Sequence, residues 1–207
     1  MRRAITVEQL IDTKFDTMQF EGLWEASFGI PERSGVWIIW GHSGNGKTRF
    51  AMQLAKYLTN FGKVLYNTLE EGARKSMQRV VTDENMKQVS SRFLVLHREP
   101  IEELKERLRK RKSAEIIIID SYQYTDLTKR QYIELKEEFD KKLFIFISHA
   151  EGKHPEGRAA KFVRYDADIK IRIEGYKAFP VSRYGGGKPY TIWHDGAEKY
   201  WGNKEFN

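Results

Sequence analysis

The chain has 207 residues, 40% of them hydrophobic and 31% charged, which is enough for one domain with a buried core and excludes a disordered or fibrous chain. It contains no cysteine and no apolar run near the ~20 residues that a membrane helix needs, so we expect a cytoplasmic protein without disulfides, thiolate metal sites or membrane contact. Lysine and arginine total 36 against 29 acidic residues, and this net charge of +7 is compatible with a polyanionic partner without requiring one.

Residues 1–20 are expected to form an N-terminal helical segment, and strand-like and helical segments then alternate from about residue 35 to 148. This alternation predicts an α/β fold with a mainly parallel central sheet flanked by helices. The expected strands are Val36–Trp40, Lys63–Asn67, Arg92–Leu96, Glu115–Asp120 and Leu143–Ser148. The expected helices are Thr48–Asn60, Gly72–Val81 and Ile101–Lys112.

The C-terminal part, residues 166–201, has a different pattern of short alternating strands. The expected strands follow Ile169, Tyr176–Val181 and Tyr190–Trp193, with a run of three glycines at 185–187 as the last turn. We therefore predict an antiparallel β extension of the sheet. No repeat or linker divides the chain, which favours a single domain over residues 1–207.

One motif carries strong chemical information. Residues 41–48 match the pattern G-x-x-x-x-G-K-[ST], between an apolar strand and an amphipathic helix. Glycines let successive backbone N–H groups surround a phosphate, and the helix that follows adds its positive end. Lysine at the seventh position reaches the β- and γ-phosphates, and the threonine hydroxyl ligates Mg²⁺. The predicted nucleotide-binding residues are Gly41, His42, Ser43, Gly44, Asn45, Gly46, Lys47 and Thr48.

A second acidic position completes the magnesium site of such a loop. Four isoleucines, 116–119, lead to Asp120 at the expected carboxyl edge of the sheet, where a carboxylate holds Mg²⁺ through its water shell. Ser121 follows instead of a glutamate, so the carboxylate that polarises the attacking water must come from another strand end. Glu70 and Glu71 are the candidates, and Glu70 is the preferred one.

Together, the motif at 41–48, Leu69-Glu70-Glu71, Asp120-Ser121 and Ile147-Ser148-His149 resemble the RecA-like ATPases. The resemblance is greatest to the DnaB-type replicative helicases, including phage helicase-primases, and to RadA, and it covers roughly residues 20 to 195. It implies ATP and Mg²⁺ as cofactors and a homo-oligomeric ATPase stimulated by single-stranded DNA in replication or recombination.

The resemblance also assigns roles to single residues. It gives Glu70 the water-activating role and His149 that of the polar sensor at the end of the strand after Asp120. Ser182-Arg183-Tyr184-Gly185 resembles the motif that supplies an arginine finger to the neighbouring subunit's ATP, a role that suits a permanently charged guanidinium. Val181 stands where the family usually has a lysine two residues before that arginine, which is a departure from the pattern.

A basic segment, residues 150–165, starts where RecA-like proteins carry their second DNA-binding loop. Its two glycines and its proline predict a mobile loop, and its cations suit backbone phosphates without base specificity. The candidate nucleic-acid contacts are Lys153, Arg158, Lys161 and Arg164.

Two other functional classes remain open from the sequence. A P-loop kinase for a nucleotide or small molecule needs a mobile lid with arginines, and the only arginine-bearing loop expected here is Gly157–Arg164. A regulatory ATP-binding module, such as a helicase loader, is the other alternative, although Asp120-Ser121 and the late strands argue against a loader of the AAA+ class.

Overall fold

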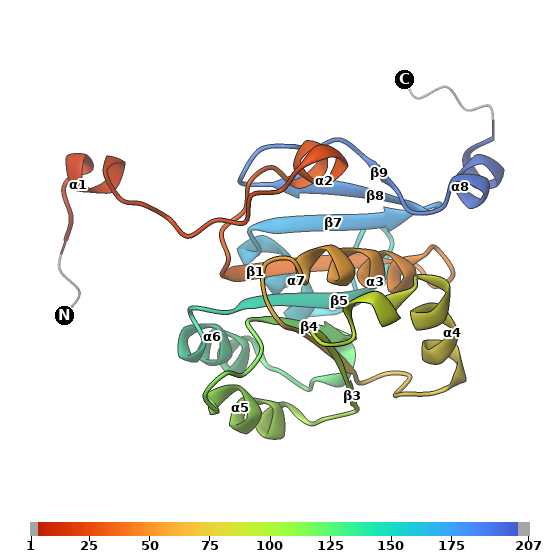
Figure 1. The fold of residues 1–207 in the computed structure, drawn as a ribbon, viewed down its shortest axis with the longest axis horizontal. Helices are drawn as coiled ribbons and strands as arrows, with labels where there is room; N and C mark the ends of the chain where they lie inside the picture. The colour runs from red at the N-terminus through yellow and green to blue at the C-terminus, as the bar shows by residue number, and fades with distance from the viewer. Residues whose placement is uncertain (1–3, 203–207) are drawn as a thin grey trace.

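One nine-stranded sheet forms the centre of the protein in a computed structural model that describes residues 4–202 (Figure 1). The strands are β1 (Gly35–Gly41), β2 (Val64–Thr68), β3 (Phe93–His97), β4 (Ile116–Asp120), β5 (Leu143–Glu151), β6 (His154–Pro155), β7 (Ile169–Glu174), β8 (Lys177–Ser182) and β9 (Tyr190–Thr191). The helices are α1 (Val7–Ile11), α2 (Gly22–Phe28), α3 (Lys47–Leu58), α4 (Lys75–Asp83), α5 (Ile101–Arg109), α6 (Lys129–Glu138), α7 (Arg158–Asp166) and α8 (His194–Trp201), with 3-10 turns η1 (Met86–Val89) and η2 (Tyr122–Tyr124).

The strand order decides which strand ends meet. It runs β3-β2-β4-β5-β1-β7-β8-β9, and β6 pairs with β5. Neighbours from β3 to β7 are parallel, whereas β8 and β9 are antiparallel, so the predicted parallel sheet with a C-terminal antiparallel extension is confirmed. Parallel strands end at one edge of a sheet. This carboxyl edge therefore carries Gly41, Thr68, Asp120 and His149.

Helices cover both faces of the sheet, which explains why its central strands are apolar throughout. Along β1, Trp37 and Ile39 pack with α2, α3 and α4, whereas Ile38 and Trp40 point to the other face and pack with α5, α6 and α7. The two cores hold the carboxyl ends of the strands at fixed spacing. They thereby position the loops that follow.

The structure contains helices that the sequence pattern did not suggest. The helix α6 lies between β4 and β5, and its start carries a capping box in which Thr128 accepts from the Gln131 amide. That spacing of threonine and glutamine was a readable signal for a helix N-terminus. The helix α8 was expected as part of the β extension, and Trp193, its N-cap residue, marks where the last strand region ends.

The basic segment 150–165, expected as a mobile loop, consists largely of strand and helix, so the expectation of a loop was wrong. The strand β5 continues to Glu151 and turns back into β6, and α7 begins at Arg158. The reason is burial, because Ala160 and Val163 of α7 are fully buried against the sheet. The residues between β5 and β6 and those just before α7 form the connecting turns of this segment.

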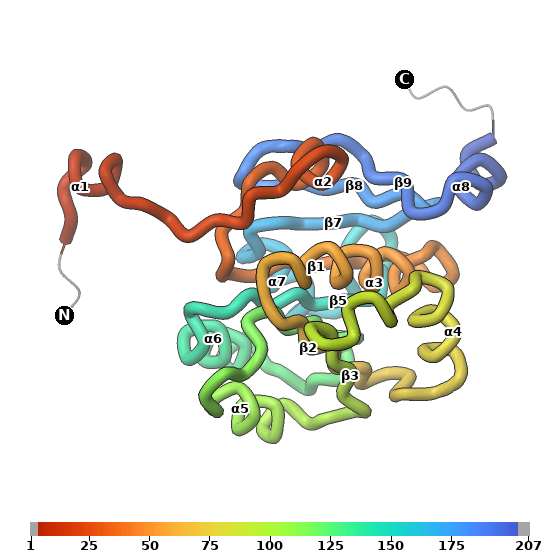
Figure 2. Tube along the Cα trace, viewed as in Figure 1, coloured from red at the N-terminus to blue at the C-terminus, as the bar shows by residue number. Residues whose placement is uncertain are grey.

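Most of the N-terminal segment is extended chain and carries one short helix. Within residues 4–20 only α1 is helical, and residues 1–3 of the expected segment lie outside the described chain. No residue of α1 is buried, and Val7 and Ile11 are 75% and 76% exposed. Figure 2 shows α1 standing away from the remaining elements. In the part of the chain that the structure describes, no helix has the length and apolar character to span a membrane.

Candidate functional site

The loop between β1 and α3 depends on glycine at two positions. Gly46 has φ +96°, and a Cβ placed on it would lie 3.1 Å from the Tyr176 ring. A Cβ on Gly41 would lie 2.4 Å from the Ile173 carbonyl oxygen, so the loop approaches β7 as closely as the backbone allows. These glycines therefore set both the curvature of the loop and its position over the sheet.

The N-terminus of α3 has the features of an anion site. Its N-cap Gly46 provides no side-chain hydrogen bond, and the first turn contains no acidic residue. The first amides of a helix have no intrahelical partner, and here no side chain caps them. They and the positive end of the helix suit a phosphate group.

The tip of the loop is held by the turn between β7 and β8. The Asn45 side-chain oxygen accepts a hydrogen bond from the Gly175 amide at 2.8 Å, and its carbonyl oxygen accepts one from the Tyr176 amide at 3.3 Å. Lys47 folds back to donate to the His42 carbonyl oxygen at 3.1 Å. The turn between β7 and β8 thus fixes the loop, and the Lys47 ammonium group contacts the backbone of the same loop.

Lys47 faces two carboxylates from neighbouring strand ends. Burial lowers the pKa of its ammonium group, and the negative charges of Asp120 and Glu70 oppose that shift. Asp120 ends β4, and Glu70 follows β2. The amides of Leu69 and Glu70 both donate to the Asp120 carbonyl oxygen, at 2.6 and 3.2 Å. One lysine and two carboxylates, carried by α3, by the segment after β2 and by the end of β4, therefore share one electrostatic environment.

Asp120 is an unusually basic carboxylate. Burial raises its pKa from 3.8 to about 6, the nearby charge of Glu70 adds to this, and a hydrogen bond from Tyr66 and the charge of Lys47 oppose it. The Tyr66 hydroxyl donates to Asp120 Oδ2 at 2.5 Å, and burial beside this carboxylate raises the pKa of the tyrosine. The charge of Lys47 stabilises ionised Asp120, but it does not outweigh the effect of burial.

The residues at this edge fit a hydrated Mg²⁺ ion. Such an ion usually keeps several waters and takes one or two protein ligands beside substrate phosphates, and here Thr48 and Asp120 are the predicted pair. Two buried hydroxyls next to Asp120, Thr68 Oγ1 and Ser121 Oγ, have no hydrogen-bond partner among the described residues. They offer polar contacts to ordered waters. No cluster of three His, Asp or Glu side chains within residues 4–202 forms a metal site by itself.

The structure distinguishes the two candidate glutamates. Glu70 Oε2 lies 2.9 Å from His149 Nε2, and both side chains are about one-third exposed, at 33% and 30%. Glu71 instead accepts a hydrogen bond from Ser76 at the start of α4. The Glu70 carboxylate therefore contacts His149 and lies close enough to Lys47 to act on its pKa, whereas the Glu71 carboxylate is bonded to the following helix.

His149 is positioned by a residue that the sequence reasoning missed. The Gln123 side-chain oxygen accepts from the His149 amide at 3.3 Å, and its amide nitrogen donates to Ser148 Oγ at 2.8 Å and to the Glu156 carbonyl oxygen at 3.0 Å. Gln123 thereby links the end of β4 to β5 and to the turn before α7. Its place three residues after Asp120 was the available signal.

Arg98 and Tyr66 were also missed. Arg98 donates to the Glu70 carbonyl oxygen at 2.8 Å and so fixes the segment after β2. Tyr66 lies two residues before the end of β2, and the sequence predicted only that it belongs to a strand. A contact to Asp120 across two strands becomes visible only with the strand register.

Arg183 lies far from the other site residues of its own chain. Ser182, at the end of β8, pairs with Ile169 at the start of β7, which is the edge of the sheet opposite the phosphate-binding loop. There the Arg183 side chain donates to Asp168 Oδ1 at 3.0 Å. The structure therefore does not bring Arg183 to Lys47 within one chain.

The four candidate nucleic-acid contacts have different surroundings. Lys161 forms an ion pair with Glu151 at 2.6 Å, and the Arg164 guanidinium lies 5.3 Å from the centre of the Trp40 ring. Lys153 and Arg158 are exposed, and within residues 4–202 neither forms an ion pair. Two of the four cations are thus engaged by the protein itself.

Comparison with known proteins agrees with this architecture. No family model matches the chain, and no curated protein matches its sequence. Among solved structures the chain is similar to the flagellar accessory protein FlaH from Methanocaldococcus jannaschii, with a TM-score of 0.61 and 16% identity over 87% of this chain and 96% of that one. The chain has a RecA-like P-loop fold. At this identity the similarity concerns the fold alone.

Proposed function

We propose that this RecA-like protein is an ATPase that hydrolyses ATP to ADP and phosphate with Mg²⁺ at the carboxyl edge of its sheet. The observation that carries the proposal is the convergence of Glu70, Asp120 and His149, from three separate segments, beside Lys47 of the loop of residues 41–48. A structural role alone does not require two partly buried carboxylates to lie beside the lysine of a glycine-rich loop with open amides.

Each residue has a distinct task in this proposal. The amides of the loop and Lys47 hold the β- and γ-phosphates and offset their charge. Thr48 and Asp120 hold the ion, which when bound supplies positive charge to the phosphate oxygens. Glu70 orients a water molecule for attack on the γ-phosphorus and accepts its proton. His149, in contact with Glu70, keeps that carboxylate aimed at the water.

Glu70→Gln tests the catalytic assignment. The variant keeps the shape of the side chain but loses the proton acceptor, so we expect ATP binding to persist and turnover to fall by about 10²–10⁴-fold. Glu71→Gln is the matched control and is expected to retain turnover. Lys47→Ala is expected to lose ATP binding itself. Phosphate release and binding of a fluorescent ATP analogue separate these outcomes, and equal turnover of Glu70→Gln and the parent protein contradicts the role of Glu70.

We extend the proposal to single-stranded DNA as an activator, in line with the replication and recombination enzymes that the sequence resembles. The exposed cations Lys153 and Arg158 next to the turn held by Gln123 support it, because Gln123 also contacts the His149 backbone. DNA bound at these cations can therefore act on His149 through Gln123. ATP turnover with and without oligo(dT) at low salt tests this part, and an unchanged rate together with no binding refutes it.

Homo-oligomerisation is a further part of the proposal. The exposed apolar side chains of α1, including Leu10 and Ile11 at 50% and 76%, suit burial against a second copy of this chain. An arginine finger role for Arg183 also requires a neighbour, because its own active site lies at the other edge of the sheet. Sedimentation of the full chain and of Ile11→Lys tests this, and a parent protein that stays monomeric at micromolar concentration contradicts it.

The kinase alternative has less support. It relied on Gly157–Arg164 as a mobile lid, but α7 occupies most of this segment and buries Ala160 and Val163. A helix packed on the sheet does not close over the phosphates as a free loop does. Transfer of phosphate to an added acceptor, with little release to water, would reverse this preference. A regulatory module that binds ATP without hydrolysis predicts equal turnover in the parent and Lys47→Ala.

A further inference from the structure

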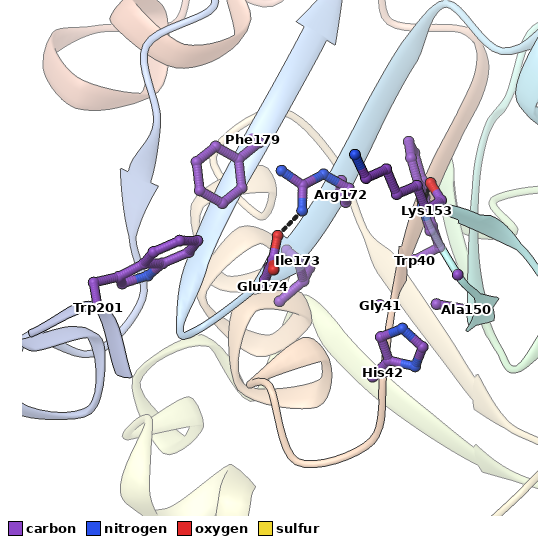
Figure 3. A pocket seen from close by; sticks show the side chains of 11 residues that line it. Trp40, Gly41, His42, Ala150, Lys153, Arg172, Ile173, Glu174, Phe179 and Trp201 are labelled. Carbon is purple, nitrogen blue, oxygen red and sulfur yellow. Dashed lines mark hydrogen bonds and ion pairs between the residues drawn. The ribbon is translucent and has the colours of Figure 1, made fainter. Parts of the chain in front are cut away.

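A second pocket lies behind the phosphate-binding loop, on the face of the sheet away from α3 (Figure 3). Its volume is about 630 Å³, within the range of small-molecule pockets. Trp40 and Lys153 line one side, Phe179 and Trp201 line the other, and Arg172 lies between them. Gly41 and His42 of the phosphate-binding loop also line it, whereas Lys47, Glu70, Asp120 and His149 do not.

The strand register explains the arrangement. Trp40 of β1 pairs with Arg172 of β7, and Arg172 pairs with Phe179 of β8, so the three side chains form one row across adjacent strands. The Arg172 guanidinium lies 4.7 Å from the centre of the Phe179 ring. Trp201 meets Phe179 edge-on, with ring centres 6.0 Å apart, and its indole N–H donates to the Gly175 carbonyl oxygen at 3.0 Å.

This face of the sheet is open at β7 and β8, unlike the face beneath α3. Along β7, Ile169, Ile171 and Ile173 are buried on one side, and the alternate residues on the pocket side are only partly buried. On β8, Phe179 is partly exposed as well. An aromatic ring and a guanidinium held on an uncovered sheet face offer flat surfaces to a ligand.

The charges indicate an anionic ligand. Arg172 forms an ion pair with Glu174, which also lines the pocket, so the net positive charge comes from Lys153. Lys153 lies at the mouth of the pocket, is exposed, and forms no ion pair within the described chain. Its carbonyl oxygen accepts from the Trp40 indole at 3.1 Å, so the turn that carries Lys153 is tied to the aromatic wall. The pocket thus combines three aromatic rings with a net positive charge.

We propose that this pocket binds a nucleotide unit other than the ATP of the active site, with its base packed against Phe179 beside the edge-on Trp201 ring and its phosphate on Lys153. Aromatic faces beside cations are the usual means of holding unpaired bases, because every base has a stacking face and every phosphate a charge. Two sources present this chemistry, a single strand of nucleic acid and a free mononucleotide. The strand source rests on the DNA part of the proposed function.

The experiment uses the full chain with Lys47→Ala, so that the phosphate-binding loop does not take up nucleotide. The probes are fluorescein-labelled (dT)12, an abasic oligomer of the same length, and free dTMP as competitor. Stacking of one base contributes about tenfold or more in affinity, so (dT)12 is expected to bind at least about tenfold more tightly than the abasic oligomer. Phe179→Leu is expected to remove this difference, whereas Phe15→Leu, a ring outside the pocket, keeps it.

Lys153→Ala is expected to weaken both oligomers alike, because it contacts phosphate, and Lys110→Ala is its control. Competition by dTMP at a concentration equal to that of the bases in (dT)12 identifies a free mononucleotide as the ligand, and its failure to compete identifies the strand. Equal binding of (dT)12 and the abasic oligomer, or an unchanged preference in a folded Phe179→Leu, overturns the proposal. Thermal melting of each variant excludes loss of the fold.

The same reagents separate this inference from the proposed function. If the parent protein hydrolyses ATP faster with (dT)12 but Phe179→Leu keeps the base preference, the pocket assignment fails and the ATPase proposal stands. If the parent hydrolyses no ATP but binds (dT)12 through Phe179, the ATPase proposal fails and the pocket stands.

Discussion

Asp120→Asn is expected to stabilise the protein in the absence of Mg²⁺ and nucleotide. Burial makes ionisation of this carboxyl unfavourable and raises its pKa from 3.8 to about 6. At about 1.4 kcal/mol per pH unit, that difference corresponds to roughly 3 kcal/mol by which the folded state disfavours the charge at pH 7. An asparagine at this position stays neutral and its oxygen still accepts the hydrogen bond from Tyr66.

Burying the amide of the asparagine has its own cost, so we expect a net gain of about 1–3 kcal/mol. For a chain of this size such a gain raises the melting temperature by roughly 2–4 °C per kcal/mol. The assay is thermal unfolding at pH 7 in the presence of a chelator, comparing the parent protein with Asp120→Asn. The same variant should bind Mg²⁺ and ATP more weakly.

The pH dependence provides the decisive check. Because the folded-state pKa of Asp120 lies above its unfolded value, the folded protein holds the proton more tightly between about pH 4 and 6. The contribution of Asp120 to the unfolding free energy of the parent protein therefore falls as the pH rises through that window. Asp120→Asn lacks this dependence. The difference in unfolding free energy between Asp120→Asn and the parent protein should reach its full size above pH 6 and should vanish near pH 4. A gap that is absent at pH 7, or that persists at pH 4, refutes the reasoning.

Three further substitutions test other parts of the structure. His149→Ala should keep ATP binding and lower kcat by about tenfold or more, because Glu70 loses the partner that orients it; an unchanged kcat in steady-state assays contradicts this. Arg183→Ala removes a partly exposed ion pair with Asp168 and a long hydrogen bond to the Asp166 carbonyl oxygen, so the free energy of unfolding should fall by no more than about 1 kcal/mol. Turnover of the oligomer should fall at least about a hundredfold, and equal turnover removes Arg183 from catalysis. Phe50→Ala empties a fully buried site and should lower the free energy of unfolding in urea by about 3–5 kcal/mol; a loss below 1 kcal/mol contradicts the described core.

Local patterns were sufficient for the phosphate-binding loop and the parallel core. The loop is a contiguous stretch whose glycine, lysine and threonine spacing expresses its chemistry directly, so the order of residues 41–48 is enough to identify it. The buried strands are recognisable because both faces are covered, which makes four consecutive isoleucines before Asp120 an unmistakable pattern. The prediction was wrong for α7, where few apolar residues are mixed with charged ones. A helix that buries only one narrow face leaves a weak hydrophobic pattern in the sequence.

The amino-acid sequence by itself determined the α/β class, the loop that suits a phosphate and the carboxylate at the end of β4, since each depends on residues close together in the chain. Tertiary structure alone decided that Glu70 rather than Glu71 faces His149, that Tyr66 donates to Asp120, and that Arg183 lies at the far edge of the sheet. These relations join residues from different strands. They depend on strand order and register, which arise from the packing of both cores and from no single stretch of the chain.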